Sequence, residues 1–180
     1  MDNNPKYELA DIIFSQEEIE NRAAEIGRQI SKDFAGETVT LIGILRGATM
    51  WMCQLAKSIE VETIIDFMAV SSYGAATKTS GIVKIVKDLE ESIEGKNVII
   101  VEDIVDSGKT LEYLKEYLNG MGPKSLKICA LLNKESRRQV DIHADYLGFE
   151  VDDVFIVGYG LDVNQMYRNL PYVTSVNVES

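Results

Sequence analysis

The strongest chemical signal in the sequence is a group of reactive side chains at residues 102–110. Glu102 and Asp103 are adjacent carboxylates, and Asp106 adds a third just before the polar run Ser-Gly-Lys-Thr. Hydroxyl groups and free backbone amides at the start of a helix form a cradle for a phosphate monoester. Carboxylates beside a phosphate require cations or hydroxyl groups to balance them, and magnesium and ribose hydroxyls both qualify. The segment therefore predicts a phosphate site with such a partner; the alternative is a charged loop with a helix cap.

Two common nucleotide-binding motifs are excluded by their spacing. A P-loop needs a glycine five residues before its Gly-Lys pair, whereas this chain has Asp103 at that position. No G-x-G-x-x-G run follows an expected strand, so a dinucleotide site has no support either. The predicted phosphate site is therefore of another kind.

Alternating apolar and amphipathic stretches indicate an α/β architecture around this segment. Ser15 and Glu18 form a capping box that opens a helix ending near Gly36. Further helices are expected over residues 49–59 and from about Thr110 to Gly120. Apolar runs predict strands at residues 39–45, 63–70, 83–89, 98–101, 126–132, 146–150, 155–157 and 173–176. Because the strands lack polar alternation, we expect a parallel sheet with both faces covered.

Three polar segments follow expected strands, at residues 45–48, 102–110 and 155–168. In an open α/β sheet, ligands bind in the crevice beyond the carboxyl ends of the strands. We therefore expect these three segments to face one site.

The composition is that of an ordinary globular chain with an acidic balance. With 18 Lys and Arg against 29 Asp and Glu in 180 residues, the net charge is −11, and the length suits one domain. This charge disfavours nucleic acids and anionic membrane surfaces as partners. Cys53 and Cys129 lie far apart in apolar stretches and are predicted to be buried free thiols. The lack of a signal-peptide pattern or a long apolar stretch predicts a cytoplasmic location.

The run VIIVEDIVDSGKT at residues 98–110 resembles the phosphoribosyl-pyrophosphate (PRPP) signature of type I phosphoribosyltransferases, and more closely that of the hypoxanthine-guanine phosphoribosyltransferases. Further segments resemble the same family in the same order: LRGA at 45–48, SSYG at 71–74, LNK at 132–134 and FIVGYGLD at 155–162. The resemblance extends over residues 12–176. It implies a type I phosphoribosyltransferase fold, with a central, mostly parallel sheet flanked by helices, a small hood region and a flexible active-site loop.

The resemblance also implies how the chain is organised and what it does. Residues 1–180 would form a single phosphoribosyltransferase domain, with a core at about 36–160 and a hood from the N-terminal segment and about 155–180. The implied reaction is Mg²⁺-dependent transfer of 5-phosphoribosyl from PRPP to N9 of hypoxanthine or guanine. The products would be IMP or GMP and pyrophosphate. A homodimer or homotetramer is the implied assembly.

On the phosphate and ribose side, the resemblance implies the following roles. Glu102 and Asp103 would face the ribose hydroxyls and a magnesium ion, and Asp106 would take the proton from N7 of the purine. The 5′-phosphate would be held by Asp106, Ser107, Gly108, Lys109 and Thr110. Pyrophosphate would be held by Arg46, Gly47, Ser72, Tyr73 and Arg168. The family also has a non-proline cis peptide in the first of these loops, here Leu45–Arg46.

On the purine side, Lys134 resembles the lysine that donates to the purine O6. Phe155 would stack on the base, and the backbone of Ile156 would contact its edge. Asp162 would contribute to purine binding and to a second magnesium site. The sequence departs from the family pattern at residue 46, where Arg46 replaces the usual lysine, and at residue 48, where alanine replaces glycine. Both changes preserve contacts that are made through the backbone.

Three other functions share parts of this pattern. Adenine phosphoribosyltransferases need an acceptor for a 6-amino group, whereas Lys134 can only donate. Pyrimidine-operon attenuators bind RNA and lack an acid at the position of Asp106. A non-catalytic PRPP sensor would lack catalytic acids that are present here.

Residues 71–81 contain small and polar side chains with little to bury, which predicts a loop. Such a long connection is usually a lid or disordered. We expect a lid, with Gly74 and Gly81 as hinges, that closes over the reacting centre and excludes water. Its alternative is a passive surface loop.

Overall fold

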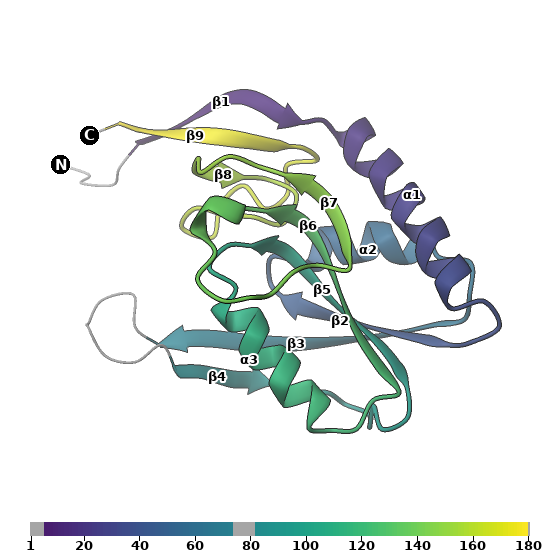
Figure 1. Cartoon of the computed structure of the whole chain (residues 1–180). Helices are drawn as coiled ribbons and strands as arrows, with labels where there is room; N and C mark the ends of the chain where they lie inside the picture. The colour runs from purple at the N-terminus through teal and green to yellow at the C-terminus, as the bar shows by residue number, and fades with distance from the viewer. Residues whose placement is uncertain (1–5, 74–81, 180) are drawn as a thin grey trace.

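The computed structural model describes residues 6–73 and 82–179, and its centre is a six-stranded sheet (Figure 1). The strand order is β4 (Ile82–Lys87), β3 (Thr63–Tyr73), β2 (Val39–Leu45), β5 (Asn97–Val105), β6 (Ser125–Asn133) and β7 (Tyr146–Glu150). Each neighbouring pair is parallel except β3 and β4, which are antiparallel. The expected α/β fold with a mostly parallel sheet is confirmed.

Helices cover both faces of this sheet, as expected from the continuous apolar strands. α1 (Gln16–Asp33) and α2 (Thr49–Lys57) pack on one face, and α3 (Lys109–Asn119) packs on the other (Figure 1). Successive residues of one strand serve opposite faces. In β2, Leu41 packs with α1 and α2, whereas Ile42 packs with α3.

A second, antiparallel sheet consists of β1 (Lys6–Phe14), β9 (Val173–Glu179) and β8 (Ile156–Val157), with β9 in the middle. It brings the two ends of the described chain side by side (Figure 1). The ring of Phe14 stacks on Phe149 of β7 with 4.3 Å between the centroids, which joins the small sheet to the large one. These residues are the ones that the sequence assigns to a hood.

The first helix begins as its capping box predicts. The backbone N–H of Glu18 donates to Oγ of Ser15, and the backbone N–H of Ser15 donates to Oε2 of Glu18. The helix ends at Asp33, before the expected limit at Gly36, and α2 ends at Lys57 rather than at residue 59.

Several strands are longer than predicted, and two of them carry residues of interest. β5 runs through Val105, so Glu102 and Asp103 lie within a strand because they pair with β6 there. β3 runs through Tyr73, so residues 71–73, expected in a loop, pair with the start of β4 instead. The remainder of that loop, residues 74–81, lies outside the described residues, so the lid stays a prediction.

Of the two thiols predicted to be buried, the prediction is confirmed for Cys129 and wrong for Cys53. Cys129 is buried, and the loss of water around it raises its pKa to about 12. Cys53 is exposed, because it lies on the face of α2 that turns away from the sheet. Among the described residues, no helix is long and apolar enough to cross a membrane.

The packing of α1 against the end of α2 provides a test of the fold. A Cβ atom at Gly27 would overlap the backbone carbonyl of Ser58. In an open helix, replacing glycine by alanine stabilises by about 1 kcal/mol. Here we expect Gly27→Ala to lower the free energy of unfolding by about 1–3 kcal/mol, because a crowded core must shift. Urea denaturation measures this, with Ala24→Gly at a half-buried position of the same helix as the reference for the alanine–glycine difference. A higher urea midpoint for Gly27→Ala would contradict the packing.

Candidate active site

Three segments that are distant in sequence meet beyond the carboxyl ends of the central strands. Gly47 follows β2, and a Cβ atom there would overlap the Asp103 carboxylate at the end of β5. Gly160 packs against the carbonyl of Gly47 just as closely. The expected cis peptide Leu45–Arg46 is present in the loop that carries Gly47. The structure therefore brings the three polar segments together, as predicted.

The carboxylates of Glu102 and Asp103 form a half-buried pair. The loss of water, followed by repulsion from Asp103, raises the pKa of Glu102 well above its usual range. The loss of water also raises the pKa of Asp103 to about 6, although the backbone N–H of Ile104 donates to its Oδ1 at 2.7 Å. The pair thus lies in surroundings that favour a cation beside it.

The chemistry of this pair fits magnesium. Carboxylate oxygens are the ligands that Mg²⁺ prefers, and it usually binds one or two of them together with water and substrate phosphates. Among residues 6–73 and 82–179, no group of three or more Asp, Glu, His or Cys side chains could hold a metal ion by itself. The donor set therefore suits a magnesium ion that arrives with a phosphorylated ligand, with Glu102 and Asp103 as its protein partners.

The predicted phosphate cradle lies at the N-terminus of α3. Gly108 is the N-cap residue with φ 83°, a left-handed conformation that favours glycine. A side chain there would also contact Ile142 at 2.6 Å. Together with the acid pair, the loop lines a cavity of about 170 Å³. Its polar lining residues are Glu102, Asp103, Asp106, Ser107, Gly108 and Thr110, whereas Lys109 is exposed.

Lys134 lies next to this cradle and is buried. Its backbone N–H donates to the carbonyl of Val105 at 2.9 Å, so it is held beside Asp106. Its Nζ donates to the carbonyl of Val154 at 2.6 Å. Phe155 is 51% exposed and precedes β8 rather than belonging to it, while Ile156 is buried. Lys134 thus connects the strand end before Asp106 to the segment that carries the exposed ring of Phe155.

The third segment is a tight turn that holds Asp162 and Arg168 together. Nη2 of Arg168 lies 2.5 Å from Oδ1 of Asp162, and its Nη1 donates to the carbonyl of Gly160 at 2.6 Å. The other carboxylate oxygen of Asp162 accepts from the backbone N–H of Gln165 at 2.8 Å. Both oxygens of Asp162 are therefore engaged within the turn, and a metal ion there would compete with Arg168.

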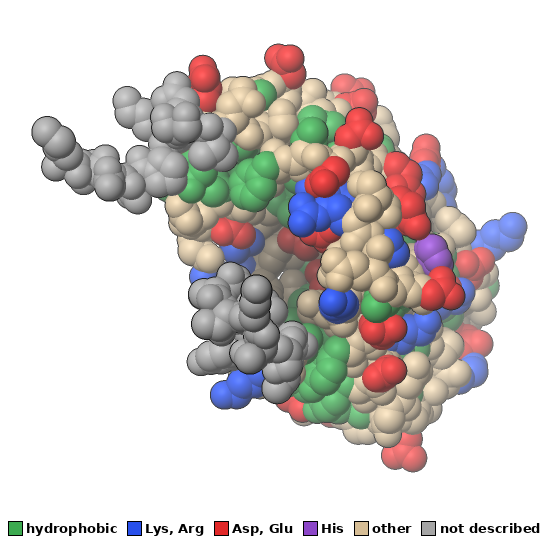
Figure 2. Space-filling model, turned by 60° about the vertical axis from the view of Figure 1, so that its left-hand side comes forward, with side chains coloured by type: hydrophobic (Ala, Val, Ile, Leu, Met, Phe, Trp, Pro, Cys, Tyr) green, Lys and Arg blue, Asp and Glu red, His purple; other side chains and the backbone are tan. Residues whose placement is uncertain are grey.

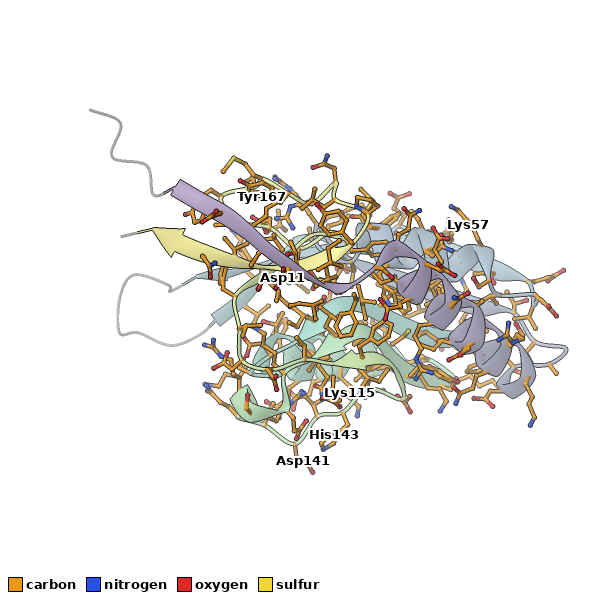
Figure 3. The ribbon with its side chains drawn as sticks, turned by 90° about the horizontal axis from the view of Figure 1, so that it is seen from above. Asp11, Lys57, Lys115, Asp141, His143 and Tyr167 are labelled. Carbon is orange, nitrogen blue, oxygen red and sulfur yellow. The ribbon has the colours of Figure 1, made fainter. Side chains whose placement is uncertain are left out.

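Backbone conformation marks the same turn as unusual. Tyr159, Asn164, Gln165 and Tyr167 have φ between 48° and 72°, values that non-glycine residues rarely adopt. Tyr167, labelled in Figure 3, packs against the cluster of Val157, Val163 and Val176. Left-handed residues of this kind cluster at ligand sites, where the surrounding structure holds them in place.

Three residues that were not predicted from the sequence contact the predicted ones. Oε1 of Gln165 accepts from Nη1 of Arg46 at 2.8 Å. Nε of Arg137 lies 3.1 Å from Oδ1 of Asp106, and Asp153 lies near both Arg137 and Lys134. Arg137 and Asp153 stand in charged turns, where sequence alone gives no signal of a partner. The side chains of Ser72 and Tyr73 lie outside the described part of the structure.

The face turned forward in Figure 2 is hollowed, with acidic side chains inside the hollow and Lys and Arg side chains at its rim. A small anionic ligand can therefore approach locally positive groups despite the net charge of −11.

Residues 10–164 match the family described as phosphoribosyl transferase domain. The chain is 48% identical over 168 residues to a hypoxanthine phosphoribosyltransferase of Salmonella typhimurium, covering 92% of this chain and 94% of that protein. It is 47% identical to a hypoxanthine-guanine phosphoribosyltransferase of Bacillus subtilis, covering 93% of each. The crystal structure of a hypoxanthine-guanine phosphoribosyltransferase from Bacillus anthracis superposes with a TM-score of 0.90 at 43% identity, covering 96% of this chain and 100% of that one.

The acid pair predicts a dependence of stability on pH. Because the pKa of Asp103 rises from 3.8 to about 6 on folding, the folded protein binds protons more tightly than the unfolded chain, and the free energy of unfolding falls as pH rises through this window. Asp103→Asn keeps the acceptor for Ile104 but removes the charge. We expect a higher urea midpoint than the parent at pH 8 and no difference at pH 4.

The control is Asp141→Asn, because the Asp141 side chain is 98% exposed and pairs with His143 rather than with a residue of the candidate site (Figure 3). It removes the same charge without touching the site. Equal midpoints for Asp103→Asn and the parent at pH 8 would show that the carboxylate pair does not oppose folding.

Proposed function

Because the chain belongs to the family of phosphoribosyl transferase domains, we propose that its site transfers 5-phosphoribosyl from PRPP to N9 of hypoxanthine or guanine in a Mg²⁺-dependent reaction. The products are IMP or GMP and pyrophosphate. The chain is an enzyme of purine salvage, a transferase that moves a phosphoribosyl group. Its fold is that of the type I phosphoribosyltransferases.

The observation that carries the purine assignment is the adjacency of Lys134 and Asp106 on neighbouring strand ends, joined through the hydrogen bond between Lys134 and Val105. A 6-oxopurine presents an acceptor at O6 and, beside it, an N7–H donor. The ammonium of Lys134 can only donate, and the carboxylate of Asp106 accepts. Adenine presents a 6-amino donor instead, so this pair favours the oxopurines. Phe155 stacks on the base, and the backbone of Ile156 contacts its edge.

The PRPP side of the proposal uses the cavity at the end of β5. The loop Asp106, Ser107, Gly108, Lys109 and Thr110 holds the 5′-phosphate with backbone amides, hydroxyls and the positive end of α3. Glu102 and Asp103 hold the ribose hydroxyls and share a magnesium ion with the ligand. When bound, that ion neutralises charge on the pyrophosphate. Arg46, Gly47, Ser72, Tyr73 and Arg168 hold the pyrophosphate itself. Asp162 contributes to the second metal site, where the ion competes with Arg168 for the carboxylate.

The proposed roles in the chemical step follow from the charges that develop on the ribose and the pyrophosphate. As the bond from C1′ to pyrophosphate breaks, positive charge builds on the ribose, and the nearby carboxylates stabilise it. Arg46 and Arg168 stabilise the departing pyrophosphate. As N9 forms its bond to C1′, N7 loses its proton, and Asp106 accepts it as the general base.

We further propose that the chain is one phosphoribosyltransferase domain with the small sheet as its hood, that it acts in the cytoplasm, and that it assembles as a homodimer or homotetramer. The acidic charge of the chain argues against nucleic acid as a partner.

The proposed function is tested by pyrophosphate release from PRPP in the presence of Mg²⁺ and one of five bases: hypoxanthine, guanine, xanthine, adenine or uracil. We expect release with hypoxanthine or guanine and none with adenine or uracil. Release with adenine alone, or with no base at all, would contradict the proposal.

Asp106→Asn tests the general base. Because the amide cannot accept the N7 proton, we expect kcat to fall by about 10²- to 10⁴-fold while PRPP affinity changes little. Steady-state kinetics and calorimetry measure the two quantities, with Asp141→Asn as the matched control. Near-normal turnover would remove Asp106 from this role.

The double variant Glu102→Gln with Asp103→Asn tests the magnesium assignment. Without the two charges, we expect PRPP affinity to lose its dependence on Mg²⁺ concentration, while the unfolding midpoint does not fall. Calorimetric titration of PRPP with and without Mg²⁺ measures this. If the parent and the variant show the same Mg²⁺ dependence, the pair does not hold the ion.

Lys134→Ala tests purine recognition. The variant leaves the purine oxygen without its donor in a buried site, which costs about 1–3 kcal/mol. We expect a KM for hypoxanthine raised about 5- to 150-fold by this loss. The control is Lys127→Ala, because Lys127 pairs with Asp145 away from the site. An unchanged KM in Lys134→Ala would show that another group binds O6.

A further inference from the structure

A chain of charged side chains connects the proposed general base to the segment that carries the purine-stacking ring. Nε of Arg137 lies 3.1 Å from Oδ1 of Asp106, and its Nη1 lies 3.3 Å from Oδ1 of Asp153. The same Asp153 oxygen lies 4.0 Å from Nζ of Lys134. Arg137 therefore bridges two carboxylates, one at the phosphate loop and one at the purine segment.

The two oxygens of Asp106 differ in their surroundings. Oδ1 is buried next to Arg137 and accepts no hydrogen bond from the described residues. The side chain is nevertheless 43% exposed, so its open surface lies on the side of Oδ2. The arginine contacts the oxygen that is closed to solvent and leaves the other one free.

The backbone supports Arg137 in this position. It ends the short 3₁₀ helix η1 (Glu135–Arg137), and its N–H donates to the carbonyl of Lys134 at 3.1 Å. Asp153, two residues before Phe155, contacts a different nitrogen of the same guanidinium, Nη1. The position of the guanidinium is thus defined jointly by the residue proposed to bind O6 and by the segment proposed to stack on the base.

We propose that Arg137 is a positioning residue for the general base, which deepens the proposed function and rests on it. Its charge holds Oδ1 of Asp106, so that Oδ2 faces the purine N7. As the N9–C1′ bond forms and the bond to pyrophosphate breaks, the N7–H bond breaks and the proton goes to Oδ2. Asp106 becomes neutral and Arg137 keeps its charge. Asp153 acts through Arg137 by holding Nη1 of the guanidinium.

The test compares four variants: Arg137→Gln, Arg137→Lys, Asp153→Asn and the double variant Arg137→Gln with Asp153→Asn. The matched control is Arg28→Gln, because Arg28 lies on the exposed face of α1. Small misplacements of a catalytic group cost as much as about 100-fold in rate. We expect kcat with hypoxanthine to fall about tenfold in Arg137→Gln, with PRPP KM and the unfolding midpoint unchanged, because exposed ion pairs contribute little to stability. Arg137→Lys retains the charge and should recover part of the loss. Asp153→Asn should add little to Arg137→Gln, because the two act through one contact.

A binding measurement separates positioning of Asp106 from a general disturbance of the site. 9-Deazahypoxanthine keeps the N7–H group, whereas 7-deazahypoxanthine has carbon at that position. With Mg²⁺ and pyrophosphate present, Arg137→Gln should weaken binding of the first about tenfold and of the second less than twofold. Equal weakening of both analogues, or a kcat in Arg137→Gln within twofold of the parent, overturns the inference. Parent protein that releases no pyrophosphate with any base overturns the proposed function instead.

Discussion

At Gly47 three segments of the chain approach one another so closely that no side chain fits between them. The Asp103 carboxylate occupies one side of this glycine, and the backbone of Gly160 occupies the other. The contact joins the loop after β2, the end of β5 and the turn beyond β8, which are far apart in sequence. The position of each proposed phosphate-binding group therefore depends on the backbone of the other two segments. The positions of Arg46 and Arg168 also depend on this contact, because both side chains bind Gln165 in the turn that follows Gly160.

The contact at Gly47 also holds the Asp103 carboxylate where it is partly removed from water, which disfavours its ionised form. Burial raises the pKa of both Glu102 and Asp103, so the pair opposes folding when it is ionised. A bound cation reverses this balance, since binding to the folded state alone stabilises it. The site thus trades stability of the free protein for affinity toward a charged ligand. Such a trade is common where function needs groups that a hydrophobic core would exclude.

Local patterns in the sequence predicted most of the architecture. The capping box at Ser15, the apolar run of β2 and the amphipathic helix α3 carry their own signals, and each is present. The strand ends were harder to predict, because β5 continues through two acids only where β6 supplies partners. The exposure of Cys53 depends on how α2 rotates against the sheet, which its mixed apolar composition does not determine.

In the candidate site, too, some residues have a local signal in the sequence and others depend on the fold. The cradle at residues 106–110 is contiguous in sequence, so its residue types and spacing predict it directly. Arg137 and Asp153, in contrast, contribute through contacts with residues that are distant in sequence. Each residue alone resembles an ordinary surface charge in the sequence. Long-range pairing between such charges has no local pattern, and only the fold reveals it.

The order of strands in the small sheet has a consequence for synthesis of the chain. In the described structure β8 pairs only with β9, and β9 is the last strand to be made. The large sheet and its helices are complete before β9 appears. A nascent chain can therefore form its phosphate cradle while the segment beside Phe155 still lacks the strand that fixes it. During translation, the proposed phosphate half of the pocket therefore forms before the proposed purine half.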